Sequence, residues 1–131
     1  MNAITTEEVQ TVLPEDADQA LLIGRVWDVE SGGPRVVAVS GGSIYDLHRM
    51  AGTVAELLEL PDPAAAVRSA LADPSLAEAR WETAAVVNAS LAGDSTRTRL
   101  LAPVDLQVIK ACGVTFVRQH DRAGHRGALC R

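Results

Sequence analysis

The tripeptide Asp46-Leu47-His48 places a carboxylate and an imidazole two positions apart, and this pair could perform acid–base chemistry. A carboxylate can orient an imidazole for proton transfer, and residues i and i+2 of a strand share one face, so the two groups could touch. No nucleophile lies nearby in the sequence. We therefore expect a surface Asp and His at the end of a strand rather than a catalytic pair.

The C-terminal segment holds a second set of candidate groups, namely His120, Asp121, His125 and Cys130. All four residue types can bind a divalent transition metal. Their spacing matches no closed zinc pattern, and the glycines between them make ordering the segment costly in entropy. We therefore expect no folded metal site here. A small independent enzyme that uses His120 with Asp121 is a third hypothesis for the function of the chain, behind the two given below.

Two glycine pairs and two aromatic residues are further candidates for ligand contact. Gly32-Gly33 and Gly41-Gly42 lack the spacing of dinucleotide- or phosphate-binding loops and lie between predicted strands, so we expect hairpin turns. Trp27 and Tyr45 could stack on a ligand, but large residues within strands are more often buried, and we expect both in the core. Cys112 lies in an apolar stretch and is predicted to be inert core.

The elements that must position these residues follow from β-branched runs, turn signals and capping residues. The meander of strands at the start is antiparallel, because its glycine-rich connections are short. Helical signals follow: Thr53 and Glu56 have the capping-box spacing, and Asp62 with Pro63 is typical of a second helix start. The predicted elements are strands over 20–29, 36–39 and 43–47, helices from 53 to before Pro61 and over 64–72, a helical segment capped by Ser75 and running through Arg80, a stretch over 83–92 that fits helix or strand, and strands over 99–103 and 108–116.

The charge distribution excludes several classes of function. The chain has 131 residues and a net charge of −5, but residues 118–131 carry four arginines against one aspartate, so the rest is more acidic still. An acidic body repels phosphate backbones, and the basic tail has no aromatic residue, so we expect no nucleic-acid binding.

No stretch is long and apolar enough for a membrane span, and the N-terminus lacks the pattern of a signal peptide. Two cysteines are too few for a disulfide framework, so we expect a cytoplasmic protein.

The run Arg99-Leu100-Leu101-Ala102-Pro103-Val104-Asp105-Leu106-Gln107-Val108-Ile109-Lys110-Ala111-Cys112-Gly113-Val114-Thr115-Phe116 carries a family resemblance. It resembles the segment with which many bacterial fumarylacetoacetate hydrolase family proteins enter their catalytic domain. Gly24-Arg25-Val26-Trp27 and Gly42-Ser43-Ile44-Tyr45-Asp46-Leu47 support the likeness, which spans about residues 13–117.

The resemblance implies an α+β chain in three parts. Residues 1–98 would be a small N-terminal accessory domain, an antiparallel meander with two or three short helices. Residues 99–117 would be the first strands of an incomplete, β-rich catalytic domain, and 118–131 a disordered basic tail. Intact members are metal-dependent hydrolases or hydratases of keto acids, and an acidic triad holds their Mg²⁺ or Mn²⁺.

That triad lies downstream of the Gly113-to-Phe116 motif in the family, so the resemblance places no catalytic, cofactor or metal residue in this chain. We expect a fragment that is inactive alone and binds no cofactor. A non-catalytic binding or oligomerisation module is the alternative, and the expected partners are a catalytic domain or further copies of the chain. The family's water-activating His lies close to His120 but one residue out of register, which we take as coincidence.

The tail has a specific explanation. One codon choice for residues 119–130 reads, when shifted by one base, as Ser-Met-Ile-Glu-Arg-Val-Ile-Glu-Glu-Arg-Cys, which resembles the helix that follows the motif in related sequences. Its apolar residues have helical spacing, whereas those of residues 119–131 as written do not. We therefore expect that these residues are out-of-frame translation and that the chain is truncated. DNA sequencing across the codons for Val117 to Gln119 tests this.

Overall fold

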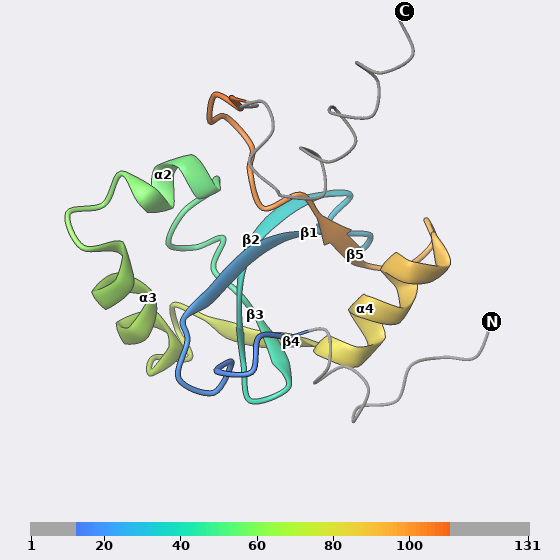
Figure 1. Cartoon of the computed structure of the whole chain (residues 1–131), viewed down its shortest axis with the longest axis horizontal. Coiled ribbons are helices and arrows are strands. Elements are labelled where there is room, and N and C mark those ends of the chain that lie inside the picture. Colours follow the sequence, from blue (N-terminus) through green and yellow to red (C-terminus); the bar gives the residue numbers. More distant parts are fainter. Residues whose placement is uncertain (1–12, 111–131) are drawn as a thin grey trace, which may run out of the picture.

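The computed structural model describes residues 13–110, which build one five-stranded sheet flanked by helices (Figure 1). The strands are β1 (Leu22–Asp28), β2 (Gly33–Ser40), β3 (Ser43–Asp46), β4 (Glu78–Glu82) and β5 (Arg99–Leu101). Their order across the sheet is β4-β3-β2-β1-β5, and every neighbouring pair is antiparallel. The first three strands are the predicted meander, and the two later strands add one to each edge.

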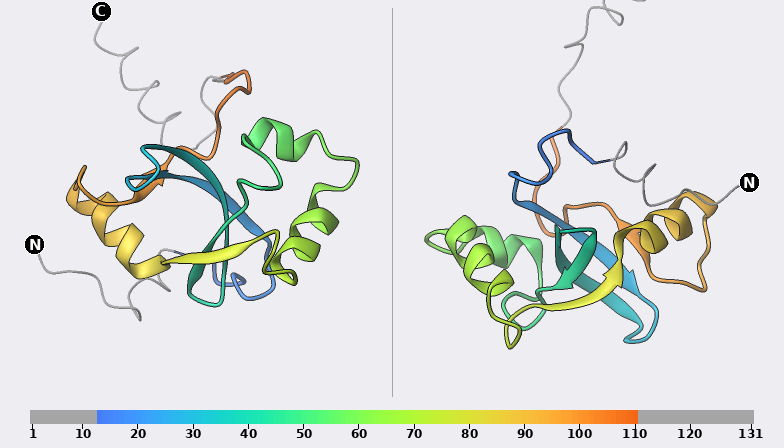
Figure 2. Two further views of the ribbon diagram at one scale, coloured as in Figure 1. Left: turned by 180° about the vertical axis from the view of Figure 1, so that it is seen from behind. Right: turned by 90° about the horizontal axis from the view of Figure 1, so that it is seen from below.

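Helices cover both faces of this sheet. Helices α2 (Val54–Leu58) and α3 (Pro63–Leu71) lie on one side, and α4 (Thr83–Ala92) lies on the other (Figure 2). The fold is therefore α+β, as the sequence predicts. Within residues 13–110 no helix has the length and apolar character needed to cross a membrane.

The strand β2 explains how the two layers share one sheet. Val36 and Ala38 pack with α2 and α3, whereas Val37 between them packs with Val86 of α4. Alternate residues of a strand point to opposite faces, so a strand covered on both sides needs a continuous apolar run. The sequence Val-Val-Ala-Val within β2 is such a run.

Capping residues set the starts of α2 and α3 as predicted. The Thr53 hydroxyl accepts the Glu56 N–H, and the Glu56 carboxylate accepts the Thr53 N–H, which completes the capping box. Asp62 accepts the Ala65 N–H at the start of α3, with Pro63 in the first turn. These local signals are strong because they satisfy backbone N–H groups that have no partner within the helix.

Four predicted elements differ from the structure or are decided by it. The helical segment capped by Ser75 is wrong: residues 78–82 form β4, where Trp81 lies opposite Ile44 and packs on the α4 layer. The ambiguous stretch 83–92 is helix α4, and the predicted strand 99–103 is β5 over its first three residues. Residues 108–110 form no strand, and the rest of that predicted strand lies outside the described residues.

Candidate functional site

One charged residue from each of four strands meets at one end of the sheet. We call Asp28 (β1), Arg35 (β2), Asp46 (β3) and Arg80 (β4) the arginine–carboxylate cluster. Arg80 Nη1 lies 3.1 Å from Asp46 Oδ2 and 3.4 Å from Asp28 Oδ2, while its Nη2 lies 2.8 Å from Glu30 Oε2. Arg35 contacts the same two aspartates at 3.8 and 3.6 Å. The cluster thereby ties the four strands together through side chains.

Asp28 is the most enclosed member of the cluster, with only 1% of its surface exposed. Burial by itself would raise the pKa of its carboxyl, but hydrogen bonds from Ser31 and from the Glu30 N–H, together with Arg80, outweigh burial and lower the pKa. Asp28 is therefore held as a carboxylate, which is the state that its arginine neighbours require.

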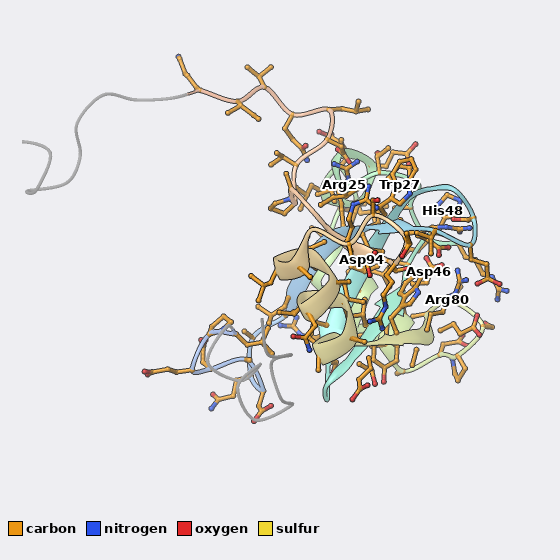
Figure 3. All side chains as sticks on the ribbon, turned by 90° about the vertical axis from the view of Figure 1, so that its right-hand side faces the viewer. Arg25, Trp27, Asp46, His48, Arg80 and Asp94 are labelled. Atoms are coloured by element: carbon orange, nitrogen blue, oxygen red, sulfur yellow. The ribbon has the colours of Figure 1, made fainter. Side chains whose placement is uncertain are left out.

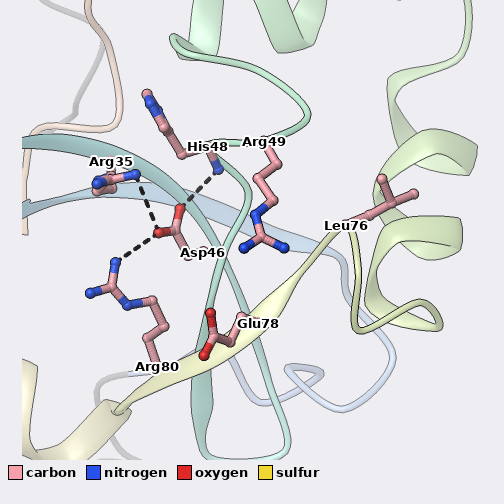
Figure 4. A pocket seen from close by; sticks show the side chains of 7 residues that line it. All are labelled: Arg35, Asp46, His48, Arg49, Leu76, Glu78 and Arg80. Carbon is pink, nitrogen blue, oxygen red and sulfur yellow. Dashed lines mark hydrogen bonds and ion pairs between the residues drawn. The ribbon is translucent and has the colours of Figure 1, made fainter.

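A pocket of about 230 Å³ opens beside the cluster, lined chiefly by Arg35, Asp46, His48, Arg49, Glu78 and Arg80 (Figure 4). Arg35 and Arg80 are already paired with carboxylates, and Arg49 donates to the Ser75 carbonyl at 3.1 Å. No lining side chain is a hydroxyl or thiol nucleophile. The charged side chains beside the pocket therefore hold neighbouring strands together through ion pairs.

The structure places Asp46 and His48 at the end of a strand, as the sequence predicts. The prediction of a surface aspartate is wrong, because the Asp46 side chain is only 10% exposed and pairs with Arg35 and Arg80. Asp46 Oδ1 accepts the backbone N–H of His48 at 2.8 Å, so the carboxylate closes a turn. The imidazole of His48 is exposed and points away from Asp46, although both residues lie on the same side of the molecule as Arg80 (Figures 3 and 4). The geometry does not form an acid–base pair.

The other candidate site residues lie in turns, against the core or outside the described residues. Gly41 and Gly42 form the two-residue β2–β3 turn with φ of +55° and +79°, and Gly32 lies in the β1–β2 turn with φ of +66°, so these are hairpin turns. Tyr45 and Trp27 are both partly buried. Tyr45 packs against the core as predicted, whereas Trp27 belongs to none of the core clusters of the described residues and has the Arg99 guanidinium 5.7 Å from its ring centre, so the prediction of Trp27 in the core is wrong. The candidates that lie outside the described residues are Cys112, His120, Asp121, His125 and Cys130. Between residues 13 and 110 no group of three His, Cys, Asp or Glu side chains could hold a metal ion.

A second polar arrangement, which we did not predict, joins the C-terminal part of the described chain to α2. The Asp105 carboxylate accepts the N–H groups of Val54 at 2.7 Å and Ala55 at 3.1 Å, and it lies 3.6 Å from Arg25 Nε. Arg25 also donates to the carbonyls of Ala102 and Val104. We call these contacts the Arg25–Asp105 clasp.

The clasp keeps Asp105 ionised. Burial would raise the pKa of its carboxyl, but the N–H groups of Leu106, Val54 and Ala55 and the charge of Arg25 outweigh this and lower the pKa. The sequence carried one signal of such a role, an aspartate inside a run from Leu100 to Ile109 whose other residues, apart from Gln107, are apolar. Its partner lies 80 positions away in the sequence, so spacing could not reveal it.

Residues 102–110 follow β5, and we call them the exit segment. Two of its polar side chains point inward, whereas several of its apolar side chains are exposed. Asp105 and Gln107 are turned inward, and the Gln107 side-chain oxygen accepts the Asp105 N–H. Leu106, Val108 and Ile109 are 75%, 95% and 76% exposed. The polar side chains are thus used within the domain, and the apolar side chains face outward.

Comparison of the chain with protein-family models, with curated proteins and with solved structures found no match to any of them.

Proposed function

We propose that this chain is the N-terminal accessory part of a fumarylacetoacetate hydrolase family enzyme, and that it docks on a catalytic domain rather than performing chemistry itself. The exit segment is the observation that supports this most directly. It lies inside the run that carries the family resemblance, and its exposed apolar side chains suit burial against another folded surface.

The clasp strengthens this proposal, because it gives the exit segment a defined starting geometry. Asp105 is bound to α2 and Arg25 to two carbonyls of the segment, so residues 102–105 are held against the sheet. An ordered apolar segment loses less entropy on docking than a free one. A cytoplasmic location belongs to the same proposal and rests on the two-cysteine count.

The accessory role has a catalytic test. The resemblance places the family's metal ligands downstream of Phe116, and members use the metal as a Lewis acid on a keto-enolate. The purified chain, supplied with Mg²⁺ or Mn²⁺, is therefore expected to show no turnover of acylpyruvates or 2-keto-3-deoxy sugar acids. Reproducible metal-dependent activity would refute the proposal.

Docking has its own test. We expect the chain to form a complex with the separately expressed catalytic domain of a family member, measured by size-exclusion chromatography with light scattering. Substituting Leu106→Gln together with Ile109→Gln should abolish the complex. The matched control is Leu91→Gln, which changes a leucine of α4 that is 58% exposed. A wild-type chain that never binds, or a complex insensitive to the double substitution, contradicts docking through the exit segment.

An oligomerisation module is the second candidate, since the same exposed side chains could pair between copies. Light scattering over a range of concentrations separates the two. Self-association lost in the Leu106→Gln, Ile109→Gln variant supports the module, and a strictly monomeric chain counts against it.

A further inference from the structure

An apolar groove lies on the side of the sheet that carries α2 and α3, away from the arginine–carboxylate cluster. It is lined by Leu21 just before β1, Ile23 of β1, Leu57 and Leu58 of α2, and Pro63 and Val67 of α3. We call this the α2–α3 groove. Its volume of about 160 Å³ is close to that of an engineered apolar cavity that binds benzene. The groove therefore has room for one Leu- or Phe-sized side chain.

The groove combines a rigid floor with an open edge. Leu57 and Val67 are buried at 0% and 1% exposure, so their positions are fixed by the core. Leu58 is 50% exposed, although it is a large apolar side chain at the edge of a hollow. Half-exposed leucines beside a preformed apolar hollow are typical of sites that receive an anchor residue.

Acidic residues lie beside the lining residues in each of the three segments. Asp18 precedes Leu21, Glu59 follows Leu58, and Asp62 precedes Pro63, and all three are exposed. Arg68, one position after Val67, is the basic residue next to the lining, so three exposed carboxylates stand against one guanidinium. The surroundings are thus apolar at the centre and acidic at the margin.

From this geometry we propose that the α2–α3 groove binds a partner segment that inserts one apolar side chain and carries Lys or Arg beside it. The apolar anchor displaces water from the groove, and the basic flank complements Glu59 and the neighbouring carboxylates. This inference is independent of the family resemblance and of the exit segment.

A random peptide library displayed on phage, panned against the full chain with counter-selection on a Leu58→Gln variant, tests the proposal. We expect enriched peptides to share a Leu, Ile or Phe anchor flanked by Arg or Lys. Calorimetry with the strongest synthetic peptide should show that Leu58→Gln weakens binding about tenfold or more, because an apolar contact is withdrawn. The matched control Leu91→Gln should leave affinity unchanged.

A charge variant tests the basic flank without altering the groove. Glu59→Lys should weaken binding about two- to threefold at low salt and lose that effect at high salt. Glu82→Lys, an exposed glutamate of β4 in another part of the sheet, is the control and should have no effect.

Three results would overturn the proposal. They are the failure of any peptide to discriminate the wild-type chain from Leu58→Gln, the selection of acidic or uncharged peptides, and self-association that Leu58→Gln abolishes. The last would mean that a second copy of the chain occupies the groove. Dependence on Leu58 but not on Leu106 or Ile109 separates this site from the docking proposed above.

Discussion

Replacing Asp105 with alanine should destabilise the protein more than removal of any ordinary helix cap. The Asp105 carboxylate accepts two N–H groups of α2, at 2.7 and 3.1 Å, and pairs with Arg25 at 3.6 Å. A hydrogen bond to a charged group contributes about 1.5–3 kcal/mol, and cap removal usually costs about 0.5–2 kcal/mol. The side chains of Asp105 and Arg25 are 7% and 17% exposed, so the donors left behind regain little water.

From these contacts we expect Asp105→Ala to lower the free energy of unfolding by about 2–4 kcal/mol. The long Arg25 contact contributes the smaller part, since partly exposed ion pairs add about 0.2–1 kcal/mol. Urea unfolding followed by circular dichroism measures the change. With a slope of roughly 1.5 kcal/mol per molar, the midpoint should fall by about 1.5–2.5 M.

Two comparisons make this prediction specific. Asp62→Ala removes a cap that accepts a single N–H at an exposed helix start, and it should cost only about 1 kcal/mol. Hydrogen exchange should show that Asp105→Ala selectively loses protection at the amides of Val54 and Ala55. A loss no larger than that of Asp62→Ala, or unchanged exchange at these two amides, would refute the clasp as a structural unit.

Three further predictions concern buried polar groups. Arg80→Met should destabilise by about 2–3 kcal/mol because it leaves buried Asp28 with Arg35, at the longer distance of 3.8 Å, as its remaining arginine partner, and urea unfolding should show a smaller loss for Arg35→Met. Thr83 is 3% exposed, and its hydroxyl has no hydrogen-bond partner within the described residues, so Thr83→Val should be neutral or stabilise by up to about 1 kcal/mol in the same assay. The lowered pKa values of Asp28 and Asp105 mean that the unfolded chain binds their protons more readily, so this stability is present above about pH 4–5 and is lost as pH falls through the folded pKa. Urea unfolding at pH 7 and pH 3 should show a shallower fall for Asp105→Asn.

The sequence predicted correctly those strands, turns and helix starts that are stabilised by contacts between residues close together in the chain. The meander follows from β-branched runs and glycine turns, and the starts of α2 and α3 follow from Thr53 and Asp62, whose side chains each accept the backbone N–H three residues further on. Segment 78–82 was predicted wrongly. Glu-Ala-Arg-Trp-Glu alternates polar and apolar residues as a strand does, but Glu and Ala have low strand propensity and Ser75 offered a helix cap, so the segment is a strand only through its pairing with β3.

Helix α4 was ambiguous for the opposite reason. Thr83, Ala84, Val86, Val87 and Ala89 are buried, so the helix has no polar face along its length to reveal its period. The sequence could not reveal the two polar sites, because the residues that form each site lie far apart in the chain. The members of the arginine–carboxylate cluster come together only through strand register, and the clasp joins residues 25 and 105.

The position of the arginine–carboxylate cluster follows from where the α4 layer ends. On that face, β1 passes from Val26 to Asp28, and β3 passes from Ile44 to Asp46, each over two positions. The apolar member of each pair packs in the α4 layer, while the charged member lies beyond it, beside arginines from β2 and β4. A helix of ten residues spans only about 15 Å, so the sheet extends past it and must end in side chains that tolerate partial hydration.

The arginines and carboxylates of this cluster pair with one another, so they offer a ligand few unpaired charged groups to bind. The surfaces with unused binding energy are those where apolar side chains remain outside, namely the exit segment and the α2–α3 groove. We therefore expect the function of this domain to depend on what it binds at those two surfaces. Comparison of Leu58→Gln with the double variant Leu106→Gln, Ile109→Gln should separate the contribution of the groove from that of the exit segment.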